Sequence, residues 1–199
     1  MIVAPPARAG GHARAAMVCC RLAARGPAGR ASAEGQTAID TALRRTIASR
    51  AELAQALLEL AGRARRAVRC CSYDAAVFAL DAAPLVAALD RLARDSRGAR
   101  VQVLVEDPLW IETRAPRFKA MRRRLCHAVQ VRAASDQDPL GDTVLWLVDD
   151  RHGLLLEPGP IVAGELWFDH QQFVRPMLAE FDRRWAAAAH DLPVVPLGL

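Results

Sequence analysis

The sequence predicts an α/β domain with a mixed, mainly parallel sheet flanked by helices. Over the first two thirds of the chain, apolar residues at helical spacing alternate with short apolar runs typical of buried strands. This alternation predicts right-handed crossovers and parallel strand pairing. Three apolar runs then follow without a helix between them, which predicts antiparallel strands added to the same sheet. The length of 199 residues and the hydrophobic content of 52% suit one globular domain with a tail.

The first predicted helix starts at a capping box formed by Ser49 and Glu52. In a capping box, each of the two side chains accepts a hydrogen bond from an amide at the start of the helix. Apolar residues then recur on one helical face: Leu53, Leu57 and Leu60. A short apolar run at 67–72 follows the basic end of this helix and predicts the first strand.

Two further helices are expected to open with a proline, because proline is tolerated in the first turn. Pro84 and Pro116 occupy these positions. The apolar faces consist of Leu85, Leu89 and Leu92 after Pro84, and of Phe118, Met121 and Leu125 after Pro116. The alternating valines of 101–105 and the run at 128–133 predict the strands that follow these two helices.

The C-terminal third contains the most hydrophobic run of the chain. Residues 143–149 predict a central strand that is buried on both faces of the sheet. Residues 154–156 and 161–168 are expected to form further strands of the same sheet. A last helix is predicted after a second capping box at Asp169 and Gln172, with an apolar face formed by Phe173, Met177, Phe181 and Trp185.

Most of the positive charge lies near the N-terminus. Residues 1–36 hold five arginines and one glutamate, and therefore +4 of the net charge of +5. This segment lacks hydrophobic periodicity, so we expect a disordered tail followed by a single domain over 37–199. The domain itself is nearly neutral, whereas a dedicated phosphate-binding protein usually carries a basic excess in its folded part.

Cysteine usage and missing nucleotide motifs argue against a bound metal or cofactor. The five cysteines form two adjacent pairs and a single residue, and no C-x-x-C spacing occurs. Gly-rich phosphate loops are also missing, so we expect no cofactor. No apolar run of 18 residues is free of charge, which predicts no transmembrane segment. An odd number of cysteines without a signal-peptide pattern suits a cytoplasmic protein.

The order of elements over residues 50–190 resembles one half of a phospholipase D superfamily enzyme. The strand that ends at Ser72-Tyr73 resembles the opening strand of that family. The helix and strand over 85–107 resemble its LxxAxxRGVxVxxLxD segment. The stretch from Phe181 to Trp185 resembles the FxxxW sequence that ends the family's last helix.

The catalytic signature of this family is His-x-Lys, then four residues and Asp, on the strand predicted at 143–149. The resemblance implies that the histidine attacks phosphorus, the lysine holds phosphate oxygens and the aspartate supports the histidine. With Asp149 at the aspartate position, Asp142 stands at the histidine position and Val144 at the lysine position. A carboxylate repels a phosphodiester and a valine cannot neutralise one. The chain therefore resembles short uncharacterised bacterial domains in which the site is degenerate.

A degenerate domain of this kind is expected to act as a non-catalytic binding or interaction module. Family enzymes pair two halves so that two motifs meet, and a single half therefore implies a homodimer or a partner chain. The alternative is a divergent phosphodiesterase or phosphatidyltransferase that uses Asp142, Asp149 and nearby histidines. The histidines at the ends of predicted elements are His127, His152 and His170.

Other residues offer further candidate binding positions. A basic cluster on the third predicted helix would suit anionic lipid or nucleic acid, and it consists of Arg122, Arg123 and Arg124. Trp110 follows a strand that ends at the ligand-binding edge of open α/β sheets, so we expect it exposed in a loop. His152 ends a polar turn that starts at Asp149. A metal or acid–base site there is the alternative to a plain turn.

Overall fold

The structure is a computed structural model that describes residues 44–188. The tail predicted over 1–36 lies outside these residues. In chain order the elements are β1 (Arg44–Ile47), α3 (Arg50–Arg63), β2 (Ala67–Ser72), the 3-10 helix η1 (Ala75–Phe78), α4 (Ala83–Asp95), β3 (Arg100–Val105), α5 (Leu109–Arg114), α6 (Pro116–Arg124), β4 (Val129–Ala133), β5 (Val144–Val148), β6 (His152–Leu156), β7 (Gly164–Trp167) and α7 (Gln171–Ala187).

The seven strands form one mixed sheet in the order β1-β7-β6-β5-β2-β3-β4. The α/β class is confirmed, and parallel pairing joins β2, β3 and β4, the three strands that alternate with helices. The pairs β2–β5, β5–β6, β6–β7 and β1–β7 are antiparallel. The antiparallel share is thus larger than expected from the sequence. One reason is β1, an N-terminal strand that the sequence pattern does not reveal.

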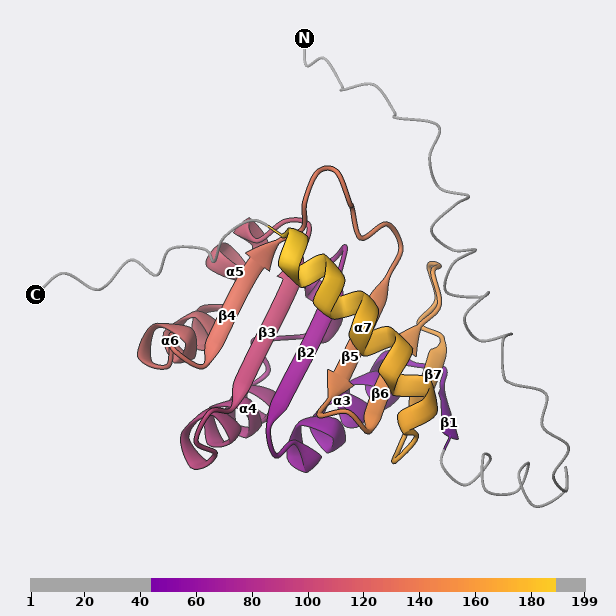
Figure 1. The fold of residues 1–199 in the computed structure, drawn as a ribbon, viewed down its shortest axis with the longest axis horizontal. Helices are drawn as coiled ribbons and strands as arrows, with labels where there is room; N and C mark the ends of the chain where they lie inside the picture. The colour runs from indigo at the N-terminus through magenta and orange to yellow at the C-terminus, as the bar shows by residue number, and fades with distance from the viewer. Residues whose placement is uncertain (1–43, 189–199) are drawn as a thin grey trace, which may run out of the picture.

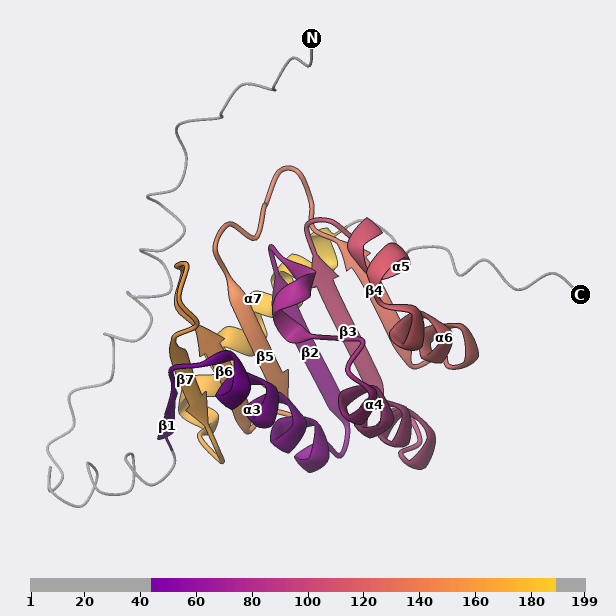
Figure 2. The same ribbon diagram turned by 180° about the vertical axis from the view of Figure 1, so that it is seen from behind.

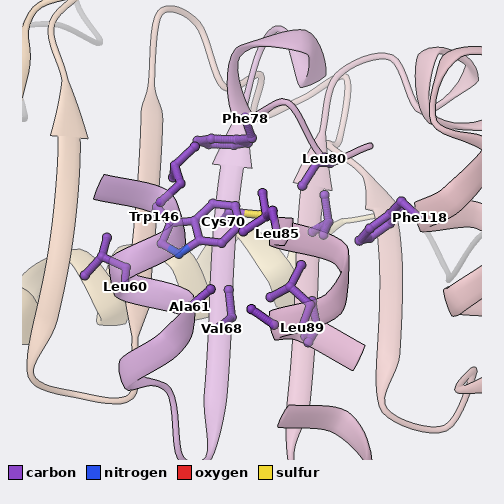
Figure 3. Close-up of a cluster of buried hydrophobic side chains, with 14 of the residues drawn as sticks. Leu60, Ala61, Val68, Cys70, Phe78, Leu80, Leu85, Leu89, Phe118 and Trp146 are labelled. Atoms are coloured by element: carbon purple, nitrogen blue, oxygen red, sulfur yellow. The ribbon is translucent and has the colours of Figure 1, made fainter. Parts of the chain in front are cut away.

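Helices cover both faces of the sheet. Figure 1 shows α7 crossing one face diagonally, and Figure 2 shows α3, α4, α5 and α6 on the other face. Strand β5 lies inside these layers, and all five of its residues are buried, as the sequence predicts. Its Trp146 packs edge-on against Phe78, with the ring centres 5.2 Å apart, among leucines from α3 and α4 (Figure 3).

Most helices begin where the capping residues and prolines in the sequence predict. The Ser49 hydroxyl accepts the amide of Glu52 at 3.2 Å, and the Glu52 carboxylate accepts the amide of Ala48 at 2.8 Å. The cap of α7 is different from the prediction. His170, not Asp169, is its N-cap, because the imidazole accepts the Phe173 amide and Asp169 has a φ of 50°.

Within the described residues, no helix has both the length and the apolar character needed to cross a membrane.

Gly164 lies where β7 meets β6 too closely for any side chain. A Cβ atom there would lie 2.4 Å from the Leu155 carbonyl oxygen and 2.9 Å from the Leu156 Cα. We expect Gly164→Ala to lower the free energy of unfolding by about 1–3 kcal/mol, because the backbone must shift. Gly62→Ala is the control, since a Cβ atom at Gly62 meets nothing within 4 Å. Urea unfolding of both variants tests this, and equal stabilities would contradict it.

Candidate functional site

The sheet has two edges at which loops gather, and they differ in charge. We call the edge where β2, β3 and β4 end and β5 begins the carboxyl edge. We call the opposite edge, where β2 and β3 begin and β5 turns into β6, the amino edge. Figure 1 shows the carboxyl edge at the top, with the long loop from β4 to β5.

The positions of the catalytic histidine and lysine of the resembled motif fall at the carboxyl edge. Asp142 is exposed in the loop that enters β5. Val144 is the first residue of β5, is only 4% exposed and belongs to the main hydrophobic core. It pairs with Ser72 on one side and with Leu156 on the other. The lysine position is thus filled by a core side chain.

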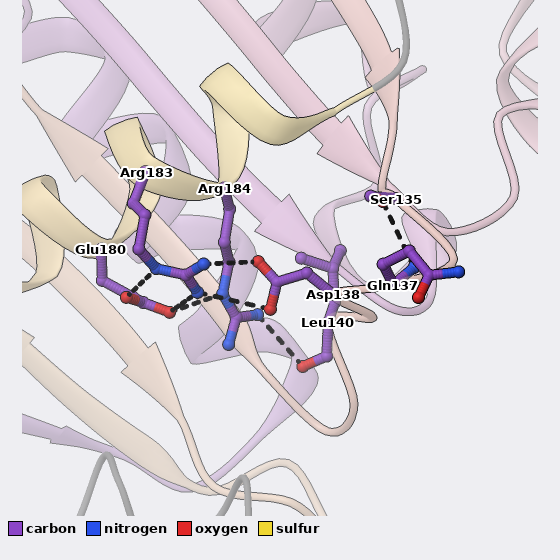
Figure 4. A network of polar contacts seen from close by, with 7 residues as sticks. All are labelled: Ser135, Gln137, Asp138, Leu140, Glu180, Arg183 and Arg184. Carbon is purple, nitrogen blue, oxygen red and sulfur yellow. Dashed lines mark hydrogen bonds and ion pairs between the residues drawn. The ribbon is translucent and has the colours of Figure 1, made fainter.

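The loop that carries Asp142 is held in place by α7 and by β3. Arg183 of α7 bonds Asp138 at 2.8 Å, and Arg184 donates to the Leu140 carbonyl at 3.4 Å (Figure 4). The Gly141 amide donates to the carboxylate of Glu106 at 3.1 Å. These contacts fix the loop in front of the ends of β2 and β3.

Carboxylates dominate the carboxyl edge. The acidic residues between β2 and η1, between β3 and α5, directly after β6 or between β4 and β5 are Asp74, Glu106, Asp107, Asp136, Asp138, Asp142 and Glu157. Within residues 44–188, Asp138 is the member of this group that forms an ion pair. Asp74 and Asp107 accept backbone amides at the starts of η1 and α5. A phosphate group at this edge would therefore meet negative charge.

Asp149, the retained residue of the motif, has a structural role at the amino edge. Its carboxylate accepts three backbone amides, from Arg65 at 3.1 Å, Arg66 at 2.8 Å and Ala67 at 2.8 Å. Its own amide donates to the Ala67 carbonyl at 2.9 Å, and its φ is 54°. Strand β5 separates it from Asp142 by on the order of 20 Å, at about 3.3 Å per residue. Asp149 therefore lies too far from position 142 to contact a group there.

His152 is a buried structural residue. It is 8% exposed as the first residue of β6, and its Nδ1 accepts the Asp169 amide at 3.0 Å. The neutral ring thus carries its proton on Nε2. Burial lowers the pKa of His152 below 6.5, and nearby Arg63 adds to this effect, although Asp169 opposes it. The hydrogen bond fixes the β5–β6 hairpin against the start of α7.

The histidines do not assemble into one site. His170 caps α7, whereas His127 is exposed in the loop before β4. No group of three histidine, cysteine or acidic side chains in residues 44–188 could hold a metal ion.

The basic cluster on α6 is not a free surface, which corrects the expectation from helical spacing. Arg122 is only 3% exposed and pairs with Glu112 of α5 at 3.2 Å. Arg124 pairs with Asp90 of α4 at 2.9 Å. Burial alone would raise the pKa of Asp90, but hydrogen bonds from arginines, Arg124 among them, lower it overall. Arg123 is half-buried.

Trp110 also differs from its prediction. It lies in the short helix α5, is half-buried and packs against the main core. Its neighbour Leu109 is the exposed apolar residue there, at 63%. Aspartate and proline before α5 start a helix instead of a loop, because Asp107 accepts the Leu109 amide at 2.9 Å.

Arginines cluster at the amino edge, where the sequence pattern alone indicates only the basic end of the first helix. They precede the parallel strands: Arg65 and Arg66 lie before β2, and Arg97 and Arg100 lie before and at the start of β3. All four are exposed. The sequence contains the signal, since basic residues come before these strands and acidic residues come after them. Only the strand order places the two sets at opposite edges.

With this geometry established, comparisons with known proteins identify the family. A family model described as a domain of unknown function, DUF7931, matches residues 49–194. The chain belongs to this family. A search of curated proteins finds no match.

Solved structures similar to this DUF7931 chain show its fold. One is TrmBL2, an archaeal chromatin protein with a novel mode of DNA binding, with a TM-score of 0.57 and 12% identity over 74% of this chain. The match spans about half of TrmBL2, 54% of its length. Another is Nuc from Salmonella typhimurium, a phospholipase D family member, with a TM-score of 0.52 and 14% identity. It covers 75% of this chain and 98% of Nuc. The phospholipase D-like fold is thereby confirmed.

We expect Asp149→Ala to lower the free energy of unfolding by at least about 1.5–3 kcal/mol, the usual contribution of one hydrogen bond to a charged group. Three amides would lose their acceptor at once. Asp150→Ala is the matched control, because Asp150 is exposed in the same turn, and we expect a change within about 0.5 kcal/mol. Urea unfolding of both variants measures this, and equal losses would show that the amides do not need Asp149.

His152 should make stability depend on pH. Because its pKa is lowered in the folded state, the unfolded chain binds the proton first as the pH falls. The stabilisation is therefore complete above pH 6.5 and is lost as the pH falls through the lowered pKa. We expect His152→Gln to reduce the stability difference between pH 7.5 and pH 5. The exposed His127 provides the control, and His127→Gln should leave that difference unchanged in thermal unfolding at both pH values.

Proposed function

We propose that this DUF7931 chain is a non-catalytic phospholipase D-like domain that works as a binding module. The observation that supports this most is the pair of residues at the motif positions, an exposed carboxylate at Asp142 and a core side chain at Val144. Val144 cannot hold phosphate oxygens, and without a cation beside it the Asp142 carboxylate repels a phosphodiester. The surrounding carboxylates add repulsion where family enzymes would bind a phosphodiester.

The geometry argues against a divergent phosphodiesterase. That alternative needs Asp142, Asp149 and a histidine in one place. Asp142 and Asp149 lie at opposite ends of β5, and His152 directs its Nδ1 to the Asp169 amide. A rebuilt acid–base site from these residues has no support in this arrangement.

A nucleic acid is the partner class that has additional support. TrmBL2 shares the fold and binds DNA, although the low identity means that this likeness extends to the fold alone. A domain with this fold but without the histidine and lysine of the motif could still bind a nucleic acid through its surface. A second copy of the chain or another protein remains the rival partner.

The purified full chain should not hydrolyse phosphodiesters. We expect no turnover of a chromogenic diester, of phospholipid vesicles or of single-stranded DNA above a protein-free blank. The variant pair Asp142→Ala and Asp136→Ala tests any signal, since both carboxylates are exposed in the loop between β4 and β5. Turnover that Asp142→Ala abolishes and Asp136→Ala keeps would refute the non-catalytic assignment.

A further inference from the structure

We propose that the amino edge of the sheet binds the phosphate backbone of a nucleic acid through Arg65, Arg66, Arg97 and Arg100. This inference rests on the proposed binding function and names its surface and partner class. It places the ligand at the edge opposite to the motif positions. Arg65 and Arg66 lie on the crossover from α3 to β2, Arg97 lies on the crossover from α4 to β3, and Arg100 is the first residue of β3. Figure 2 shows these two connections at the same edge of the sheet.

The two loops are joined directly by the sheet. The Arg100 amide donates to the Arg66 carbonyl at 3.0 Å, and Arg100 pairs with Ala67 in the parallel ladder. Strands of one sheet lie about 4.8 Å apart, so the backbones that carry the arginines of the two connections are neighbours at this edge. Arg97 extends this surface along the turn at Gly98, whose φ is 82°.

These arginines keep their charge available. In the described part of the chain, none of the four forms an ion pair, although ion pairs neutralise many other arginines, such as Arg124 with Asp90. The acidic residues at this edge are Asp95, Asp149, Asp150 and Asp169, and Asp169 already pairs with Arg151 at 3.1 Å. The carboxylate of Asp149 already accepts three backbone amides. The guanidinium groups therefore remain free for an external anion.

Asp149 also holds the basic loop in a defined conformation. Because it binds the amides of Arg65, Arg66 and Ala67, the backbone at these residues is fixed before any ligand arrives. A fixed backbone reduces the entropy lost on binding. Guanidinium groups donate two parallel hydrogen bonds to phosphate oxygens, which suits a polymer that presents phosphates at regular intervals.

The surroundings favour a nucleic acid over a membrane. Proteins that bind at a lipid surface usually add apolar side chains that enter the bilayer. The exposed large hydrophobic residues of the described chain lie elsewhere, on the body of α3 or in the segments after β2, β3 and β6: Leu58, Tyr73, Leu109 and Ile161. The acidic carboxyl edge would in addition orient the molecule with its amino edge toward a polyanion.

Fluorescence anisotropy with a labelled single-stranded 20-mer and its duplex tests the proposal. The full-length wild type should bind both, with affinity falling steeply between 50 and 200 mM salt. Arg66→Gln/Arg100→Gln should weaken binding about tenfold at low salt and reduce the slope of log affinity against log salt by about 1 to 2. These side chains are exposed and form no hydrogen bond or ion pair with the residues that the structure describes, so circular dichroism should show an unchanged fold.

The matched control is Arg50→Gln/Arg114→Gln, which removes the same charge from exposed positions on α3 and α5. It should keep wild-type affinity within about twofold, because neither arginine lies at the amino edge. Every variant retains the arginine-rich residues 1–36, so any contribution of that segment to binding is the same in all of them. Equal losses in both double variants, or wild-type binding by Arg66→Gln/Arg100→Gln, would overturn the proposal. Binding to phosphatidylserine vesicles without binding to either oligonucleotide would also overturn it. Gel analysis of the probe separates the two ideas, because cleavage contradicts the non-catalytic assignment and leaves the surface assignment intact.

Discussion

The carboxylate of Asp149 is the contact on which the arrangement of the sheet most depends. Asp149 lies in the tight turn after β5, and its carboxylate accepts three amides from the segment that enters β2. Parallel and antiparallel parts of the sheet meet at these two strands. The Asp149 side chain therefore fixes the segment between α3 and β2 against the end of β5, which belongs to the antiparallel part of the sheet. Asp149 therefore has a structural role that does not depend on the residues at 142 and 144.

Charge is distributed along the strand direction of this DUF7931 domain. Carboxylates gather beyond the ends of β2 and β3, and free arginines gather before their starts. The near-neutral net charge of the folded part hides this separation, because the two groups cancel in the sum. Because of this cancellation, the net charge of the domain gives no sign of a phosphate-binding surface. The positions of the arginines at the amino edge do support such a surface.

The fold could be predicted from the sequence because periodicity and helix caps are local signals. Ser49 and Glu52 mark a helix start, and the run through Trp146 marks the central strand. The surface could not be predicted in the same way, because exposure depends on contacts between distant residues. The helical spacing of Arg122 is that of a solvent-exposed arginine. In the structure its side chain is buried and forms an ion pair with Glu112 of α5. Trp110 likewise depends on the packing of α5 against the core.

The pairing of β1 with β7 has a consequence for the order in which the domain assembles. Arg44 and Trp167 are partners in that ladder, although about 120 residues separate them in the chain. A ribosome releases β1 about 120 residues before β7, which is its partner strand in the described part of the chain. The outermost strand at this side of the sheet must therefore wait unpaired during translation. Closing so long a loop places this step late in folding, after the local βαβ units have formed.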